Sequence, residues 1–205
     1  MMLAFDHIVI GCTDLAHGTA WAEAALGVAF QPGGQHARFG THNTLLGLKD
    51  GLYLEVIAVD PAAPPGPRWF GLADFEGAPR LINWVCRAPD LDAALAVLPG
   101  ACGPAVPMER GDLRWSIAVP EDGGLPWDGA LPTPISWAPG IRHPAARLAP
   151  SGVRLTGWEV HHPQAAAAEA ALAGLLDDSR VRFVTSPVPG YRARFDTPSG
   201  PRVLS

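Results

Sequence analysis

The chain has 205 residues, of which 48% are hydrophobic and 17% charged, so it can bury a core and is not disordered as a whole. Its 15 Lys and Arg residues are outnumbered by 20 Asp and Glu residues, and the formal net charge is -5. A chain without a basic surplus is poorly suited to neutralise a phosphate backbone, so we expect no nucleic-acid partner. The chain also has 23 Gly and 22 Pro, which interrupt helices too often for a helical bundle.

The cysteines and the N-terminal region indicate the compartment. Cys12, Cys86 and Cys102 lie far apart in the sequence, which favours neither a disulfide framework nor a thiolate zinc site. The first residues include Asp6 and Asp14 and show no basic stretch before an apolar one, unlike a secretory signal. No apolar run is long enough to span a bilayer. We therefore expect a cytoplasmic protein with no membrane partner.

The first part of the chain reads as a strand, a helix and further strands. FDHIVIG is a short apolar strand, and the alanine-rich helix that follows is predicted to end at Gly27. Three strand-like segments come next, at residues 28–30, 41–48 and 52–59. Asp50-Gly51 predicts a hairpin turn between the last two. Residues 1–60 are therefore predicted to form a βαβββ module.

The order of strand, turn and helix occurs three times. The repeats begin at FDHIVIG, RLINWVC and RLTGWEV, and an ungapped alignment places His7 on Asn83 and on Gly157. Nearly equal spacing of this kind is typical of duplicated supersecondary units. We expect a second βαβββ-like module at residues 80–138 and a third, shorter βαββ unit at residues 152–205, all within one compact domain.

Two proline- and glycine-rich segments, residues 60–79 and 120–152, connect the predicted units. The second is unusually long for a compact domain, and loops of this length are more often functional or mobile than idle. It contains Trp127 and Trp137, which predicts that it packs against the rest of the protein.

A histidine and a glutamate on apolar strands are the main functional candidates. Alternation of side chains along a strand places Phe5, His7 and Val9 on one face of the first strand and Asp6 on the other. By the same rule, Tyr53, Glu55 and Ile57 share one face of the strand at residues 52–59, so Glu55 lies between apolar neighbours. An unpaired carboxylate there is costly, so it must be protonated, hydrogen-bonded, paired with a cation or bound to metal.

If the two strands are neighbours in one sheet, His7 and Glu55 point into the same concavity. A neutral imidazole and a carboxylate suit a divalent ion such as Zn, Fe, Mn or Ni. The alternative is a histidine and a glutamate that interact inside a cleft with no ion. Two ligands alone are too few for a complete site, so the residues leave both interpretations open.

The ordered motifs of the chain resemble those of a known family. FDHIVIGCTDL, GGQHARFGTHNTLLGL and DGLYLEVIA, followed by LINWVCRAPDLDAAL, MERGDLRWSIAVP and LPTPISWAPGIRHP, are similar to the glyoxalase-like branch of the vicinal oxygen chelate superfamily. The resemblance implies an α+β fold in which βαβββ modules with mixed or antiparallel sheets curl into a cup, with helices on the outer face. The superfamily includes lyases, isomerases, dioxygenases, epoxide-opening transferases and drug-binding proteins, so the reaction stays open.

The resemblance also implies where a metal would bind. In metalloenzymes of the superfamily, side chains from the first and last strands of each module hold the ion. His7 matches the first-strand ligand and Glu55 the last-strand acid. In the second module, Asn83 takes the place of His7, and Ser136 takes a place where related sequences carry an acid or amide. Asparagine and serine are poor ligands for a transition ion, so the predicted metal site is incomplete.

Further polar and aromatic residues are candidates for the wall of the cup. Asn43 matches a family position that faces the pocket, although a sheet-bonded asparagine is the ordinary alternative. His36 either lines the cup or is solvated, and Arg110 either pairs with Asp112 at the surface or anchors a substrate carboxylate. The predicted substrate-binding residues are His36, Thr41, Asn43, Tyr53, Asn83, Arg110, Ser136 and Trp137.

Three functions fit these observations. The favoured one is an enzyme of lyase or isomerase type that acts on a small oxygenated metabolite, assisted by a divalent ion at His7 and Glu55. The second is a metal-free protein that binds and sequesters an amphipathic small molecule. The third is metal-free acid–base catalysis by His7 and Glu55. A homodimer that pairs modules across two chains is one expectation for assembly, and completion of the cup within one chain is the other.

Overall fold

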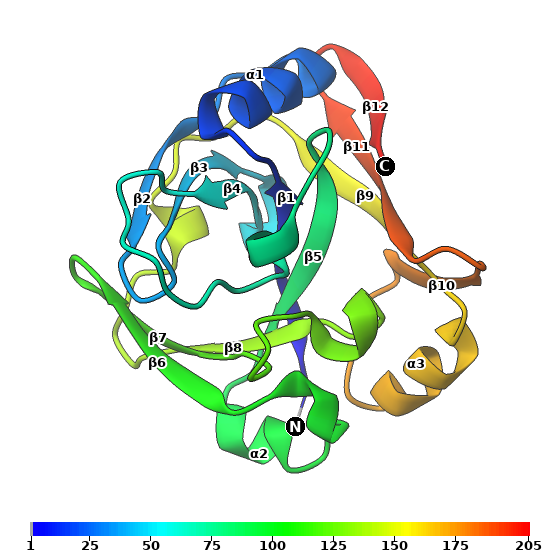
Figure 1. Ribbon diagram of the computed structural model, residues 1–205. Coiled ribbons are helices and arrows are strands. Elements are labelled where there is room, and N and C mark those ends of the chain that lie inside the picture. The colour runs from blue at the N-terminus through cyan, green and yellow to red at the C-terminus, as the bar shows by residue number, and fades with distance from the viewer. Residues whose placement is uncertain (1) are drawn as a thin grey trace.

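The structure is a computed structural model that describes residues 2–205 (Figure 1). The first module contains β1 Ala4–Gly11, α1 Leu15–Leu26, β2 Gln31–His36, β3 Thr41–Gly47 and β4 Tyr53–Val59. The second contains β5 Arg80–Arg87, α2 Leu91–Leu95, β6 Ala105–Arg110, β7 Leu113–Ala118 and β8 Thr133–Trp137. Both modules therefore have the order βαβββ.

A third unit follows, with β9 Arg154–His162, α3 Ala165–Leu172, β10 Val181–Thr185, β11 Gly190–Thr197 and β12 Gly200–Leu204. It has three strands after its helix, one more than the βαββ order predicts. Short 3-10 turns lie at Lys49–Gly51, Leu72–Asp74, Gly100–Cys102, Pro126–Gly129 and Pro144–Ala146. No helix within residues 2–205 has both the length and the apolar character that a membrane crossing requires.

The strands of the first two modules form one eight-stranded sheet in the order β2-β3-β4-β1-β5-β8-β7-β6. The modules join side by side where β1 and β5 pair antiparallel, and in each module the first strand is parallel to the last. The sheet is strongly curled, as Figure 1 shows, and the edge strands β2 and β6 approach each other. The predicted α+β cup is confirmed.

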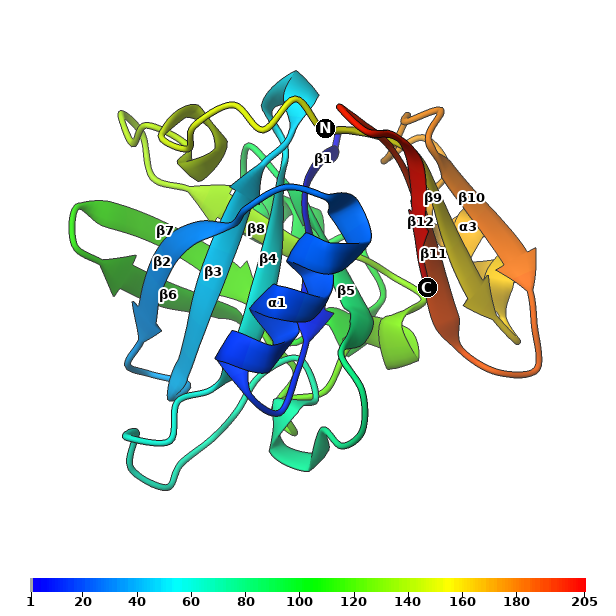
Figure 2. The same ribbon diagram turned by 90° about the horizontal axis from the view of Figure 1, so that it is seen from above.

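The outer face of this sheet is covered by α1, α2 and the third unit. Figure 2 shows α1 against the first module, and the four-stranded sheet β10-β9-β11-β12 standing beside it. Aromatic side chains fill the space between the two sheets: the ring of Phe5 lies 5.8 Å from that of Trp84 and 6.1 Å from that of Trp158. Because these large rings are buried, this apolar core holds the third unit to the cup.

The pairing of β1 with β5 contains a bulge in β1. Phe5 pairs with Cys86 and His7 pairs with Val85, so Asp6 is an extra residue without a partner. A bulge interrupts the alternation of side chains along the strand. The prediction that Phe5 and His7 share a face is therefore wrong: Phe5 belongs to the outer core, whereas His7 lines the cup.

The same deformation occurs in β5. Val9 pairs with Asn83 and Ile10 pairs with Leu81, which leaves Ile82 as the extra residue. The two bulges occupy equivalent places in the repeat, because the alignment places the bulge residue of β1 on Ile82 and the histidine that follows it on Asn83. This agreement gives the correspondence between the modules a structural basis.

Candidate functional site

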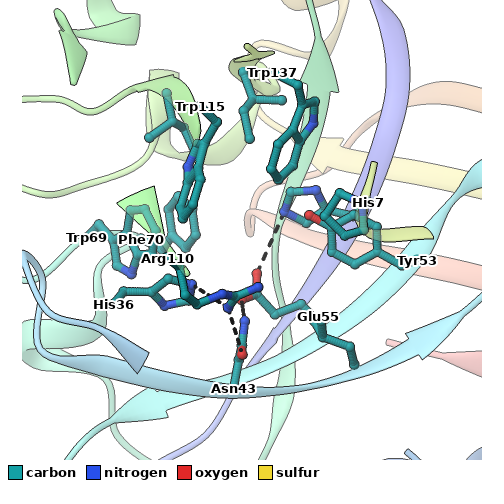
Figure 3. A pocket seen from close by; sticks show the side chains of 14 residues that line it. His7, His36, Asn43, Tyr53, Glu55, Trp69, Phe70, Arg110, Trp115 and Trp137 are labelled. Atoms are coloured by element: carbon teal, nitrogen blue, oxygen red, sulfur yellow. Dashed lines mark hydrogen bonds and ion pairs between the residues drawn. The ribbon is translucent and has the colours of Figure 1, made fainter. Parts of the chain in front are cut away.

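The concave face of the eight-stranded sheet encloses a narrow cavity of about 30 Å³, because large side chains fill most of the cup. Both modules and the connector between them contribute to its wall (Figure 3). The lining residues are His7, His36, Asn43, Leu45, Tyr53, Glu55, Trp69, Phe70, Arg110, Trp115, Ile117, Ile135, Trp137 and Pro144.

A buried carboxylate, that of Asp6, anchors the back of the site. Its Oδ1 accepts a hydrogen bond from Nδ1 of His7 at 2.7 Å. Its Oδ2 accepts hydrogen bonds from Nε2 of His143 at 2.9 Å and from Nε1 of Trp137 at 3.1 Å. Burial alone would raise the pKa of Asp6, but the hydrogen bonds from His143 and His7 outweigh it and hold that pKa well below its ordinary value.

This carboxylate fixes the orientation of the His7 ring. An ionised carboxylate only accepts hydrogen bonds, so Nδ1 of His7 carries a proton and Nε2 is directed into the cavity. The ring of Tyr53 stacks on that of His7, with centroids 4.3 Å apart and an interplanar angle of 17°. Burial, followed by the nearby charges of Asp6 and Glu55, raises the pKa of Tyr53 well above its ordinary value, so its hydroxyl stays protonated.

His7 and Glu55 face each other, as the sequence predicts. Nε2 of His7 lies 3.7 Å from Oε2 of Glu55, which is too long for a hydrogen bond. The other carboxylate oxygen, Oε1, accepts a hydrogen bond from the side-chain amide of Asn43 on the adjacent strand β3. Within residues 2–205, Oε2 of Glu55 accepts no hydrogen bond from the protein, so the two facing atoms keep unused bonding capacity at the cavity.

The strand β2 and the end of β6 bring two more predicted residues into the site. His36 is buried, and its Nδ1 lies 3.1 Å from the hydroxyl of Thr41. Nε2 of His36 and Oδ1 of Asn43 lie 3.2 and 3.3 Å from the same guanidinium nitrogen of Arg110. Arg110 therefore points into the cup, while Asp112 pairs with Arg147 at 2.7 Å. The alternative of a surface pair between Arg110 and Asp112 is wrong, because each of the two side chains has other partners.

The second module lacks an ionisable pair equivalent to His7 and Glu55. Asn83 is buried and donates a hydrogen bond to the hydroxyl of Thr133 at 2.9 Å, and neither residue lines the cavity. In the parallel pairings, Val9 faces Glu55 and its counterpart Val85 faces Thr133. Thr133 therefore takes the place of Glu55.

The assignment of Ser136 to that place needs correction. Ser136 pairs with Ser116 on β7 and lies between Ile135 and Trp137, both of which line the cavity. Because side chains alternate along β8, Ser136 points to the opposite face of the sheet. A role for Ser136 in holding substrate inside this cup is thus not compatible with its position.

Sequence reasoning missed two polar residues of the site, Asp6 and His143. Asp6 was placed on the wrong face, because a bulge leaves no signal in the alternation of polar and apolar residues. A histidine before a proline is typical of the start of a turn, and His143 does cap the 3-10 turn, where its Nδ1 accepts from the amide of Ala145. Its contact with Asp6 spans 137 residues and has no local signature.

The donors at the site do not fit the predicted divalent metal. Within residues 2–205, no group of three or more His, Cys, Asp or Glu side chains is placed to hold an ion. His7 and Glu55 offer one atom each, whereas Nε2 of His36 faces Arg110 and the oxygens of Asp6 accept other hydrogen bonds. The guanidinium of Arg110 also places a positive charge where further ligands are needed.

Comparisons with known proteins agree with this architecture. The sequence profile of a family described as glyoxalase-like domain matches residues 5–176. A hypothetical protein from Staphylococcus aureus has a similar solved structure, with a TM-score of 0.66 and 16% identity over 93% of this chain and 88% of that one. Methylmalonyl-CoA epimerase from Mycobacterium tuberculosis matches with a TM-score of 0.44 and 22% identity, over 67% of this chain and 89% of that one. Among curated proteins, no sequence matches the chain.

Proposed function

This chain belongs to the glyoxalase-like domain family, and we propose that it is an enzyme that moves a proton on a small oxygenated metabolite, with Glu55 and His7 as its acid–base pair. The observation that supports this most directly is the pair of facing atoms, Oε2 of Glu55 and Nε2 of His7, which lie 3.7 Å apart at the narrow cavity. Reactions of lyase and isomerase type commonly begin by removing a proton next to a carbonyl group.

Glu55 is suited to be the general base. Its side chain is held by the amide of Asn43 through Oε1, which leaves Oε2 free to accept a proton from a bound molecule. The residue is 5% exposed, so water competes little for that oxygen. A positioned carboxylate in such an environment contributes about 10²–10⁴-fold to the rate of a proton-transfer step.

His7 is suited to the complementary role of proton carrier: its Nε2 first takes up a proton, from Glu55 or from solvent, and then donates that proton to the oxygen on which charge develops. Asp6 keeps the proton on Nδ1 and sets the ring angle, so Nε2 is the atom that exchanges a proton with the bound molecule. Tyr53 packs against one face of the ring and prevents it from turning. The two residues thus place a base and a proton carrier side by side at the cavity, within reach of neighbouring atoms of one bound molecule.

The test is exchange of carbon-bound protons with solvent. The protein is incubated in D₂O with small 2-oxo acids, 2-hydroxy acids and neutral 2-oxo compounds, and deuterium incorporation is followed by NMR. We expect at least one compound to exchange, with a rate at least about a hundredfold lower in Glu55→Gln. Ser136→Ala, on the opposite face of β8, is the matched control. Absence of exchange with every compound, or an unchanged rate in Glu55→Gln, would contradict the proposal.

A second candidate function, sequestration of a small molecule, is favoured by the aromatic wall. Trp69 and Phe70 stack with centroids 4.6 Å apart, and Trp115 lies 5.5 Å from Trp137 on the adjacent strand. Such a wall suits an apolar or aromatic ligand. A binding protein would be stabilised against thermal unfolding by its ligand and would show no proton exchange. Elemental analysis of the purified protein tests the metal-assisted enzyme. A stoichiometric first-row ion that is lost in His7→Ala and in Glu55→Ala would favour metal-assisted catalysis over both metal-free functions.

A further inference from the structure

We propose that Arg110 forms a carboxylate-binding site inside the cup and that the substrate is therefore a small carboxylic acid. This inference rests on the proposed proton-transfer function, since it adds the substrate class to it. The guanidinium comes from the second module and reaches the polar residues of the first. It is the positively charged group at the wall of a cavity that also contains the Glu55 carboxylate.

The bonding of Arg110 leaves its charge unpaired. One terminal nitrogen lies 3.2 Å from Nε2 of His36 and 3.3 Å from Oδ1 of Asn43, and both of these partners are uncharged acceptors. Burial, together with the charge of Arg110, lowers the pKa of His36 to about 3, so the imidazole stays neutral. In the described chain, no carboxylate lies within ion-pair distance of Arg110, and its other nitrogens donate no hydrogen bond to the protein.

The strand opposite Arg110 is shaped to admit its side chain. A Cβ atom on Gly34 would lie 2.8 Å from Cδ of Arg110, and one on Gly33 would lie 2.0 Å from Oδ1 of Asn43. The backbone amide of Gly34 also donates to that oxygen at 2.8 Å. Two consecutive glycines therefore allow the guanidinium and the amide to approach the edge of the sheet.

Asn43 connects the anion site to the proposed base. Its amide oxygen faces Arg110 and its amide nitrogen donates to Glu55, so the two charged groups lie at the two ends of one amide. A carboxylate bound to the free edge of the guanidinium would place its neighbouring carbon next to Glu55. The planar guanidinium matches a carboxylate with two parallel hydrogen bonds, and the narrowness of the cavity limits the ligand to a small molecule.

The experiment uses malonate as the probe, with malonamide as its uncharged analogue and inorganic phosphate as a second anion. Binding to the full chain is measured by calorimetry and by the fluorescence of the cavity tryptophans. We expect malonate to bind and malonamide to bind more weakly, with malonate affinity at least about tenfold lower in Arg110→Gln. Arg114→Gln is the matched control, because Arg114 is half exposed and pairs with Glu109 at 3.3 Å.

Several outcomes would overturn the inference: no binding of malonate, equal binding of malonamide, tighter binding of phosphate, or unchanged affinity in Arg110→Gln. If Arg110→Gln does not fold, Arg110→Lys is measured in its place. The lysine keeps the positive charge but lacks the planar guanidinium with its two parallel donors. Malonate should then still bind better than malonamide, but with lower affinity than in the wild type. Glu55→Gln should bind malonate at least as well as the wild type, because a like charge is removed. Malonate binding without proton exchange would leave the anion site standing while the proposed catalysis fails.

Discussion

In the first module the bulge of β1 turns Asp6 and His7 toward the cup, and β4 adds Glu55 beside them. In the second module, the equivalent bulge of β5 contains Ile82 and is followed by Asn83, and Thr133 takes the place of Glu55. One backbone design thus presents an ionisable set in one half and an uncharged set in the other. Apart from Arg110 at the end of β6, the remaining inner face of the second module is apolar, with Val85, Met108, Leu113, Trp115, Ile117 and Ile135.

The difference shows what each half must do to bury polar atoms. Asn83 and Thr133 satisfy each other with hydrogen bonds and need no further partner. The charge of Asp6 needs two histidines and an indole, and the guanidinium of Arg87 also approaches it, at 3.6 Å. A buried charge is tolerated only with such a set of donors. The first module therefore contains the buried network of ionisable side chains, and the second module contributes donors to it and completes the wall of the cavity.

The largest effect on stability is expected from Asp6→Asn, which removes the charge at the centre of the first module. Loss of one partner from a buried charge network costs about 3–5 kcal/mol. The pKa of Asp6 is lower in the folded state than the unfolded value of 3.8, so its contribution is complete above that pH and is lost as the pH falls below it. In urea unfolding, the free-energy difference between variant and wild type should stay constant from about pH 7 to about pH 4 and begin to shrink below that.

Asp112→Asn is the control for that measurement, because its exposed pair with Arg147 should leave the free energy of unfolding nearly unchanged. If Asp6→Asn were as stable as the wild type at neutral pH, the network around Asp6 would not be a stabilising feature of the first module.

A smaller effect, independent of pH, is expected from Thr133→Val in the second module. The substitution keeps the shape but removes the hydroxyl, so the buried amide of Asn83 loses its hydrogen-bond acceptor, at a cost of about 1–3 kcal/mol. Neither group ionises, so the loss should be the same at each pH of the urea series. Ser136→Ala, on the other face of β8, should cost less. A loss that shrinks in acid would erase the distinction between the modules.

The smallest effect is expected at the contact between the modules. Trp137→Phe removes the hydrogen bond from the indole to Asp6, whereas Trp115→Phe on the same wall removes a ring whose nitrogen makes no hydrogen bond within the described residues. Both variants lose similar volume, so the difference between their free energies of unfolding isolates the hydrogen bond, at about 1 kcal/mol. Equal losses would mean that the second module does not stabilise the charge of the first.

Much of the fold could be predicted from the sequence, because the repeat, its strand patterns and the glycine-ended helix are local signals. The facing of His7 and Glu55 also follows from local patterns plus the pairing of two strands. Asp6 could not be placed, since the bulge that turns it inward depends on pairing with β5. The position of Arg110 depends on the curl of the sheet, which brings the end of β6 to β2, and no local pattern reports that curl.

The covalent connection between the two modules has an evolutionary consequence. In a cup assembled from two identical chains, every substitution appears twice, once on each side, and a change that suits one wall must also be tolerated in the other. Here β6, β7 and β8 belong to their own stretch of sequence, so a mutation at Trp115 or Ile117 alters one wall alone. Substitutions in one half can therefore change the shape of the cavity, while the ionisable side chains of the other half stay the same.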